Sequence, residues 1–272
     1  MCAKRSGPFR AKLEDSIMRG FIDLHCHWVH GIDDGARTVQ EGADILVALH
    51  AVGFSTVVAT PHTRPGMFEN DAAGLRNAYA STLEQVRVAA RGPLPTVLLA
   101  SEHYFDDIVF SRIRSGTALP YPPLPGQAAK KVRPILVELP PRAFPPQIQA
   151  RFFDLRRAGC SAVLAHPERY QPVWDDDACL DPLIDAGAAL LLDVCALVGK
   201  YGQRSQRCAE KLLDEGAYSA ACSDAHRPED AEVTARAIER LTELAGVDEI
   251  DRLFRIGPTK ILEGRGAPLV TP

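Results

Sequence analysis

Two histidines stand one residue apart at the end of a short apolar run. The run is Phe21-Ile-Asp-Leu-His-Cys-His-Trp28, and Val-His-Gly-Ile-Asp-Asp-Gly35 follows it directly. Because the side chains of a strand alternate between its two faces, His25 and His27 point to one side and Cys26 to the other. Two neutral imidazoles on one face of a strand end can bind one divalent cation. A single His-x-His pair is weak evidence, since it also arises as an ordinary strand cap.

Further potential ligands recur at the ends of later apolar runs, and Asp224 and His226 repeat the one-residue spacing. The full set of expected metal ligands is His25, His27, Asp34, His62, Glu102, Glu138, His166, Asp224 and His226. Asp193 lies before the end of its run, and its role stays open. Any one of these residues could be a strand cap or a core histidine. Together, four carboxylates among five imidazoles would suffer desolvation and repulsion unless cations were bound. A set without thiolates favours a catalytic cluster, and nine ligands suit two or three ions with a bridging carboxylate.

Short apolar runs that alternate with amphipathic stretches would position these side chains. The sequence predicts strands at 21–28, 55–62, 96–103, 134–139, 161–166, 189–194 and 218–226. It predicts helices near 39–51, 72–90, 107–114, 146–158, 203–215, 228–245 and 248–262. This alternation indicates a parallel sheet buried on both faces, and seven units suit a closed (β/α) barrel better than an open sheet. The carboxyl ends of such strands meet at the face where α/β folds place their sites.

The remaining segments are a loosely ordered arm at 1–20 and an irregular proline-rich loop at 115–134. We expect a single catalytic domain over 21–265. The arm mixes basic and acidic residues without an apolar core, so it does not read as a signal peptide. No apolar run is long enough to cross a membrane. These features predict a soluble, cytoplasmic protein.

Composition narrows the function classes. The 272 residues are 46% hydrophobic and 24% charged, with a net charge of −4, so the chain can form a sizeable core. No global basic field argues for nucleic acid or anionic membrane. The seven scattered cysteines lack a C-x-x-C pair, which is typical of reduced thiols. None has an arginine six residues later, so the cysteine-dependent phosphatase mechanism is excluded. Phosphate-binding glycine loops and the G-x-S-x-G elbow are also absent.

The other histidines serve as a contrast. His50 falls within a predicted helix, and His103 lies on the opposite strand face from Glu102. His30 lies in the first loop and is at most a neighbour of the ligands. We interpret all three as structural or surface residues.

The motifs match a known family. They are His25-Cys-His27, Gly31-Ile-Asp-Asp-Gly35, Ala59-Thr-Pro-His62, Gly66-Met-Phe-Glu69, Glu102, Glu138, Ala165-His-Pro-Glu-Arg-Tyr170 and Ser223-Asp-Ala-His226. Together they resemble the polymerase-and-histidinol-phosphatase (PHP) superfamily. The resemblance covers residues 21–262 and is closest to the bacterial capsule- and exopolysaccharide-associated protein tyrosine phosphatases.

This resemblance implies a distorted (β/α)7 barrel with a trinuclear site, usually manganese-dependent, with iron, zinc and magnesium as alternatives. By motif, His25, His27, Glu102 and Asp224 would bind the first ion. Glu102 would bridge to a second ion bound by Glu138 and His166, and Asp34, His62 and His226 would bind the third. Arg169 matches the family's phosphate-binding arginine. A further arginine that relatives carry after the Ser-Asp-x-His motif has no counterpart at the same spacing, and Arg227 or Arg64 could replace it.

The implied activity is hydrolysis of phosphotyrosine. A water that bridges two divalent ions loses a proton near neutral pH and could attack phosphorus in line, while the third ion and Arg169 clamp the other oxygens. The partner that the family implies is the tyrosine-rich tail of a bacterial polysaccharide-export kinase.

Two alternatives stay open. One is a PHP-type hydrolase acting on histidinol phosphate or a nucleotide phosphodiester, and the other is a non-catalytic binding module. The basic stretches 130–133 and 204–207 could contact acidic partners, although solvated loops are the simpler interpretation. Oligomeric state is also left open.

Overall fold

Parallel strands alternate with helices along the whole described chain. The computed structural model describes residues 19–128 and 131–265, so the predicted arm at 1–20 lies almost entirely outside the described residues. The strands in this part are β1 (Phe21–Cys26), β2 (Phe54–Ala59), β3 (His62–Thr63), β4 (Thr96–Leu99), β5 (Glu102–Tyr104), β6 (Arg133–Glu138), β7 (Cys160–Ala165), β8 (Ala189–Asp193) and β9 (Ala220–Cys222). They pair in parallel, in the orders β1-β2-β4 and β3-β5-β6-β7-β8-β9.

Two of the predicted strands are each divided into two. The stretch 55–62 becomes β2 and β3 because Pro61, which has no N–H to donate, interrupts the ladder. The stretch 96–103 becomes β4 and β5. Backbone hydrogen bonds keep the halves aligned, with Ala100 donating to the Ala59 carbonyl at 2.8 Å and Glu102 to the Pro61 carbonyl at 3.2 Å. The nine strands therefore form seven extended segments, as predicted.

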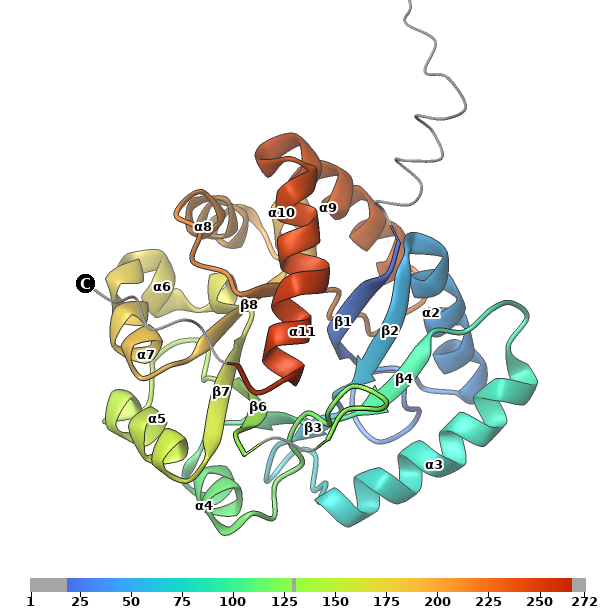
Figure 1. The fold of residues 1–272 in the computed structure, drawn as a ribbon, viewed down its shortest axis with the longest axis horizontal. Helices are drawn as coiled ribbons and strands as arrows, with labels where there is room; N and C mark the ends of the chain where they lie inside the picture. Colours follow the sequence, from blue (N-terminus) through green and yellow to red (C-terminus); the bar gives the residue numbers. More distant parts are fainter. Residues whose placement is uncertain (1–18, 129–130, 266–272) are drawn as a thin grey trace, which may run out of the picture.

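The first and last segments lie side by side. Cys26 and Ala225 form a parallel bridge, the His27 N–H donates to the Ala225 carbonyl at 2.9 Å, and the Asp224 N–H donates to the His25 carbonyl at 3.0 Å. These bonds connect β1 to the chain after β9 and complete a ring of strands around which the helices lie (Figure 1). The predicted α/β fold of the distorted (β/α)7 barrel type is confirmed.

The distortion lies between β4 and β6, where the proline-rich loop enters the ring. Tyr121 donates its backbone N–H to the Pro134 carbonyl at 2.9 Å, so the loop occupies the free edge of β6. Its phenol donates to the Leu24 carbonyl at 2.7 Å from inside the barrel. The loop thus fills a gap that β4 and β6 leave open.

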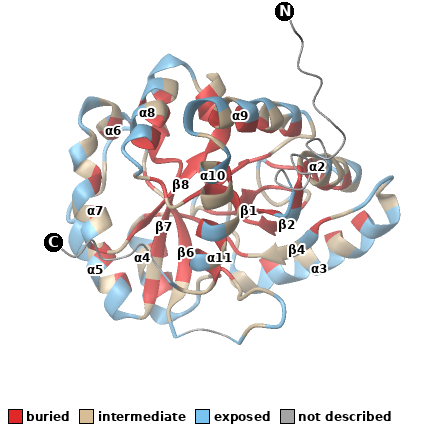
Figure 2. Cartoon of the chain, turned by 45° about the horizontal axis from the view of Figure 1, so that its top comes forward, coloured by how far each residue is buried: buried red, intermediate tan, exposed pale blue. Residues whose placement is uncertain are grey.

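The helices cover the outside of the ring, with buried faces inward and exposed faces outward (Figure 2). They are α2 (Val39–Val52), α3 (Ala72–Ala89), α4 (Asp107–Ser115), α5 (Ile148–Arg157), α6 (Gln171–Asp175), α7 (Asp181–Asp185), α8 (Gln203–Asp214), α9 (Asp230–Ala245), α10 (Val247–Asp251) and α11 (Gly257–Leu262). Thr38, Asp71 and Asp106 cap the starts of α2, α3 and α4 through their side-chain oxygens. In the described part of the chain, no helix is long and apolar enough to span a membrane.

Short helical pieces make up the remaining regular structure. They are η1 (Pro167–Arg169), η2 (Asp177–Leu180), η3 (Val194–Val198) and the π-helical η4 (Arg252–Ile256). The segment 167–185, which contains η1, α6, η2 and α7, was not predicted as helical, since its pieces are too short to show helical periodicity. The predicted helix 248–262 is a continuous run of α10, η4 and α11.

Inward-facing side chains fill the barrel with a second apolar cluster. Its members are Ile22, Leu24, Val58, Ala100, Tyr121, Leu136, Val163, Ala165, Ala189, Leu191, Ala220, Cys222, Ile261 and Leu262. Ile261 and Leu262 come from α11, which lies across the front of the ring in Figure 1 and closes that end. Two residues beyond the last apolar position, the inward side chain becomes polar, as in Ala100 to Glu102, Leu136 to Glu138 and Cys222 to Asp224. Strand alternation alone therefore gathers polar side chains at the opposite end.

Candidate metal centre

A bulge in β1 brings its histidines to the interior. Asp23 pairs with Val57 and Cys26 with Ala59, so three steps along β1 face two along β2. The extra residue lets Leu24 reach the apolar interior while the neighbouring His25 reaches the polar end. The predicted alternation of His25, Cys26 and His27 holds beyond the bulge, because the Cys26 thiol lies in the outer core.

Four donor atoms meet around the β1 histidines. The two Nε2 atoms of His25 and His27 are 3.1 Å apart. Glu102 Oε2 lies 3.2 Å from His25 Nε2 and 3.6 Å from His27 Nε2, and Asp224 Oδ1 lies 3.3 and 3.4 Å from the same two atoms. Metal–ligand bonds of about 2.0–2.2 Å place donors roughly 3.0–3.6 Å apart in octahedral or tetrahedral geometry. These spacings are those of donors that share a cation, and His25, His27 and Asp224 form one group that could hold an ion.

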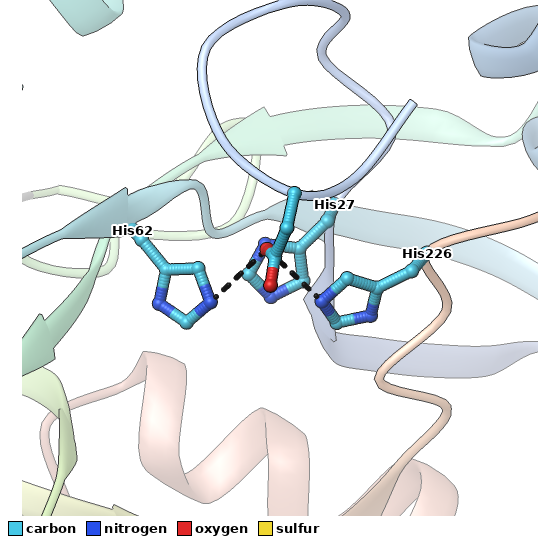
Figure 3. A group of neighbouring side chains, drawn as sticks. His27, His62 and His226 are labelled. Atoms are coloured by element: carbon cyan, nitrogen blue, oxygen red, sulfur yellow. Dashed lines mark ion pairs between the residues drawn. The ribbon is translucent and has the colours of Figure 1, made fainter. Parts of the chain in front are cut away.

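A second group lies around the Asp34 carboxylate. Asp34 Oδ1 is 3.4 Å from His62 Nε2 and 3.4 Å from His226 Nε2. The ring of His27 completes this group, and Figure 3 shows it lying between those of His62 and His226. The His27 and His226 rings are stacked, with centroids 4.1 Å apart. His27 thus adjoins both of these ligand groups.

Glu102 connects the remaining ligands. Its Oε1 lies 3.2 Å from His166 Nε2, and its Oε2 lies 2.9 Å from His62 Nδ1. The structure groups Glu102 with His25 and His166 on one side, and with His62 and Glu138 on the other. Among the described residues, the trio Glu102, Glu138 and His166 does not form one group by itself. All nine predicted residues nevertheless belong to one connected cluster.

Two of the nine have a left-handed backbone. His166 has φ 35° and Asp224 has φ 45°, a region that costs free energy for a residue with a Cβ. Both stand where a strand ends. The positive φ at Asp224 also ends the predicted strand 218–226 early, so that β9 covers only Ala220–Cys222. The conformation directs both side chains towards Glu102 and His25.

The electrostatics of the cluster favour bound cations. Burial acts to lower the pKa of His25, but Glu102 and Asp224 outweigh it and raise this pKa to about 9. For His226, burial is likewise outweighed by Asp224, and the pKa rises to about 9. Burial and the charge of Glu102 raise the pKa of Glu138 to about 7. Glu138 Oε2 is buried and has no hydrogen-bond partner among the described residues. Positive charge is stabilised here, and a ligand oxygen is available.

Sequence reasoning missed Asp33, although it chose the adjacent Asp34. Asp33 Oδ2 lies 2.8 Å from His27 Nδ1 and accepts the His62 N–H at 3.1 Å, while Oδ1 accepts the Gly35 N–H at 2.9 Å. Burial would raise its pKa, but the nearby His27 outweighs burial and lowers it. A carboxylate behind a metal-binding histidine orients the ring. The doubled Asp in Gly31-Ile-Asp-Asp-Gly35 was the signal.

Asp23 was also missed. Its Oδ1 accepts the Ser223 N–H at 3.1 Å and the His25 N–H at 3.2 Å, and its Oδ2 accepts the Ser223 hydroxyl. Burial raises the pKa of Asp23 to about 6, against these hydrogen bonds. It stabilises the join between β1 and β9 directly behind the cluster. An Asp inside an apolar strand run was the available signal.

The three candidate arginines have different surroundings. Arg169 Nη1 donates to Asp224 Oδ2 at 2.6 Å and lies 3.6 Å from Asp193 Oδ2. Its guanidinium carbon lies 4.4 Å from the centroid of the Tyr201 ring. Burial is outweighed by Asp224 and Asp193, which raise the pKa of Arg169. Asp193, whose role the sequence left open, is fully buried next to Arg169.

Arg64 and Arg227 contact different parts of the chain around the cluster. The Arg64 guanidinium covers the ring of Tyr104 at 4.0 Å, and Tyr104 pairs with Glu138 in the β5–β6 register. The Arg227 guanidinium donates to the backbone carbonyls of Gly35 and His226. Arg64 therefore lies beside a candidate ligand, whereas Arg227 is bonded to the loop that carries Asp34.

The histidines outside the predicted set have structural contacts. His103 is buried, with Nδ1 3.0 Å from the Leu136 carbonyl and Nε2 accepting the Leu119 N–H at 3.3 Å. His30 Nδ1 lies 3.1 Å from the Thr82 hydroxyl on α3, and His50 lies in the last turn of α2.

Comparisons with known proteins agree with this fold. The tyrosine-protein phosphatase YwqE of Bacillus subtilis is 28% identical over 205 residues, which cover 75% of this chain and 77% of YwqE. The tyrosine-protein phosphatase CpsB of Streptococcus pneumoniae is 24% identical over 249 residues, covering 89% and 98%. A solved structure, described among those of YwqE and CpsB as unique metal-dependent tyrosine phosphatases, shares the fold with a TM-score of 0.75 at 24% identity, covering 90% of this chain and 95% of that one.

A family model extends the comparison along nearly the whole described chain. The model for capsular polysaccharide synthesis, CpsB/CapC, matches residues 21–263, a span that contains every candidate ligand. With that match, the chain belongs to the CpsB/CapC family.

Proposed function

We propose that this protein is a metal-dependent protein-tyrosine phosphatase that transfers the phosphoryl group of phosphotyrosine directly to water. One observation carries the proposal. The Nε2 atoms of His25 and His27 lie 3.1 Å apart, and each lies 3.2–3.6 Å from a carboxylate oxygen of Glu102 and of Asp224, beside Arg169. The names of the relatives, tyrosine-protein phosphatases, support the same reaction.

The proposed ligands divide into three overlapping groups. His25, His27, Glu102 and Asp224 form the first, and Asp34, His62 and His226, with His27 adjacent, form another. Glu102 would connect these groups, since it lies with His25 and His166 on one side and with His62 and Glu138 on the other. Two to three divalent ions, with manganese as the expected metal, would supply Lewis-acid charge and a water of lowered pKa. The buried and unpartnered Glu138 Oε2 fits a ligand role at the centre of this arrangement.

Two arginines flank Glu138 and would bind the phosphoryl oxygens. Arg169 and Arg64 each lie over a tyrosine ring, Tyr201 and Tyr104, at 4.4 and 4.0 Å. A planar guanidinium can donate two parallel hydrogen bonds to phosphate, and the ring beneath fixes its plane. We therefore assign the second phosphate-binding arginine to Arg64. Arg227, which is bonded to two backbone carbonyls, would orient the loop of Asp34.

The leaving group needs little help. A tyrosyl oxygen has a conjugate-acid pKa of about 10, so it can depart with modest protonation, unlike an alkyl alkoxide. The residues of this chain therefore have to bind and orient the phosphoryl group. Arg169, Arg64 and the proposed divalent ions would supply the positive charge that binds the phosphoryl oxygens.

The expected substrate is the phosphorylated tyrosine-rich tail of a bacterial polysaccharide-export kinase, met in the cytoplasm. The support is the family's description as one of capsular polysaccharide synthesis. A PHP-type activity on histidinol phosphate or on a nucleotide phosphodiester is the competing proposal.

A substrate panel separates these activities. The metal-loaded protein is assayed with a phosphotyrosine peptide, histidinol phosphate and a phosphodiester. We expect the highest kcat/KM on the peptide. Preference for another substrate would keep the site but reject the tyrosine assignment, and no turnover on any of them with metal bound would indicate a binding protein. Labelling with ¹⁸O-water adds a check on which bond breaks, since attack of water on phosphorus places the label in phosphate and not in tyrosine.

A further inference from the structure

A cavity opens directly beside the proposed metal ligands. It has a volume of about 250 Å³ and is lined by the proposed ligands Glu138 and His166, by Arg169, and by Pro141, Tyr170, Trp174 and Tyr201. A dry cavity of about 150 Å³ is known to accept benzene, so this one can accept a phenyl ring. Three aromatic rings, those of Tyr170, Trp174 and Tyr201, line the cavity together with Arg169, which we propose binds phosphate.

The aromatic walls are fixed by hydrogen bonds. Trp174 Nε1 donates to the Glu168 carbonyl at 2.7 Å. The Tyr170 hydroxyl donates to the Ala165 carbonyl at 2.8 Å and accepts the Leu139 N–H at 3.1 Å. Little side-chain ordering would therefore accompany the binding of a ring.

A groove lies between α6 and α8, next to this cavity across Trp174. It has a volume of about 490 Å³ and is lined by Val173, Trp174, Asp175, Asp176, Asp177, Arg204, Arg207, Cys208 and Lys211. Trp174 lines both the cavity and the groove. A compact substrate would occupy only the cavity, whereas a chain could extend past Trp174 into the groove.

Some charged side chains of the groove have partners within it, and others do not. Lys211 pairs with Asp177, and Asp176 Oδ1 accepts the Ala178 N–H at 3.1 Å. Arg204 and Arg207 are exposed, lie one turn apart on α8, and have no ion pair with any residue that the structure describes. Two guanidinium groups are therefore free to meet an acidic side chain on a bound chain.

We infer that the cavity and the groove bind one extended peptide. The phosphotyrosyl ring would occupy the cavity, and an acidic residue next to it in the peptide would pair with Arg204 and Arg207. This inference rests on the proposed function and adds to it that the substrate is a polypeptide with acidic residues beside the phosphotyrosine.

The test compares three substrates: free phosphotyrosine, a phosphotyrosine peptide with acidic neighbours, and the same peptide with glutamines in their place. The variant is Arg204→Glu/Arg207→Glu, and the control is Arg87→Glu/Arg91→Glu, which reverses two exposed charges at the end of α3, on the far side of the barrel from α6 and α8 (Figure 1). Reversal of both charges replaces attraction by repulsion, so the acidic peptide should lose about tenfold in kcat/KM.

The loss should appear in KM and weaken with added salt. Hydrolysis of free phosphotyrosine should be unchanged, and the glutamine peptide should respond less than the acidic one. An acidic peptide that performs no better than free phosphotyrosine, or is indifferent to the Arg204→Glu/Arg207→Glu change, would overturn the inference while leaving the phosphatase activity intact.

A binding measurement tests whether the peptide occupies the groove without depending on catalysis. A labelled acidic peptide carrying a non-hydrolysable phosphonate analogue of phosphotyrosine is titrated with each protein. About tenfold weaker binding to the Arg204→Glu/Arg207→Glu protein, with the control unchanged, supports the groove even if the enzyme hydrolyses nothing. Equal binding by all three proteins would overturn it.

Discussion

Asp33 Oδ2 lies 2.8 Å from Nδ1 of His27, on the opposite side of the ring from the Nε2 that faces Glu102 and Asp224. The carboxylate fixes which nitrogen of His27 carries a proton and leaves the other free to bind a cation. The same carboxylate also accepts the His62 N–H. One buried side chain thus orients residues from two strands.

Replacement Asp33→Asn should weaken metal binding while the protein stays folded. Loss of such an orienting carboxylate typically lowers metal affinity about 10–100-fold. A competitive titration against a chelator would measure this. Glu84→Gln, an exposed change on α3, is the matched control and should have wild-type affinity. Equal affinity for both variants would contradict the role given to Asp33.

Arg169 and Arg64 should matter for the phosphoryl group. We expect Arg169→Ala to lower kcat/KM about 10²–10³-fold at saturating metal, the size of losing one charged donor to a transition state. Arg169→Lys should recover only part of this loss, because a lysine lacks the planar fork. Arg64→Ala should also lower kcat/KM. If Arg64→Ala keeps the wild-type kcat/KM, Arg64 is not the second phosphate-binding arginine, and Arg227 becomes the candidate.

Replacing either of two glycines in the first loop, Gly35 or Gly31, tests whether the position of this loop matters for metal binding. A Cβ on Gly35 would lie 2.1 Å from the His27 carbonyl oxygen, whereas one on Gly31 would meet nothing within 4 Å. Gly35→Ala must therefore displace the loop that carries Asp33 and Asp34. Gly31→Ala costs only about 1 kcal/mol, because Gly31 has a φ of +73°. Metal affinity should fall sharply for Gly35→Ala and stay near wild type for Gly31→Ala. Similar affinities for the two would show that the loop adapts.

His103 predicts a pH dependence of stability. Burial lowers its pKa from 6.5 to about 4, since the ring must stay neutral to accept the Leu119 N–H. The unfolded chain binds a proton more readily, so this contribution is complete above pH 6.5 and is lost as the pH falls towards 4. In chelated protein, His103→Gln should have a flatter dependence of the free energy of unfolding over that window. Parallel curves for the two proteins would contradict the neutral, hydrogen-bonded ring.

Many strands and helices could be predicted from short stretches of sequence. Apolar runs predict β1, β6, β7 and β8, and capping residues such as Thr38 and Asp71 mark helix starts, because both depend on interactions between residues close in the chain. What escaped prediction depends on contacts between distant segments. The bulge of β1 is defined only by its pairing with β2, and β9 is short because Asp224 turns to a left-handed backbone towards His25.

The candidate site shows the same division. Parallel strands bring their ends together, so Glu102, Glu138 and Asp224 could be grouped from the sequence. Sequence could not distinguish the task of Asp33 from that of Asp34, because the two neighbours differ only in which way the loop turns them. Nor could it choose between Arg64 and Arg227. That choice depends on the ring of Tyr104 and on two backbone carbonyls.

Metal dependence at Glu102 is the most direct test of the proposed function, since this carboxylate contacts His25, His27, His62 and His166. Phosphate release from a phosphotyrosine peptide is measured for wild-type and Glu102→Gln protein, each after chelation and again after reloading with Mn²⁺. We predict that chelated wild-type protein is inactive and regains turnover with Mn²⁺, whereas folded Glu102→Gln does not. Full activity after chelation, or equal recovery in Glu102→Gln, would contradict a metal-dependent phosphatase centred on this residue.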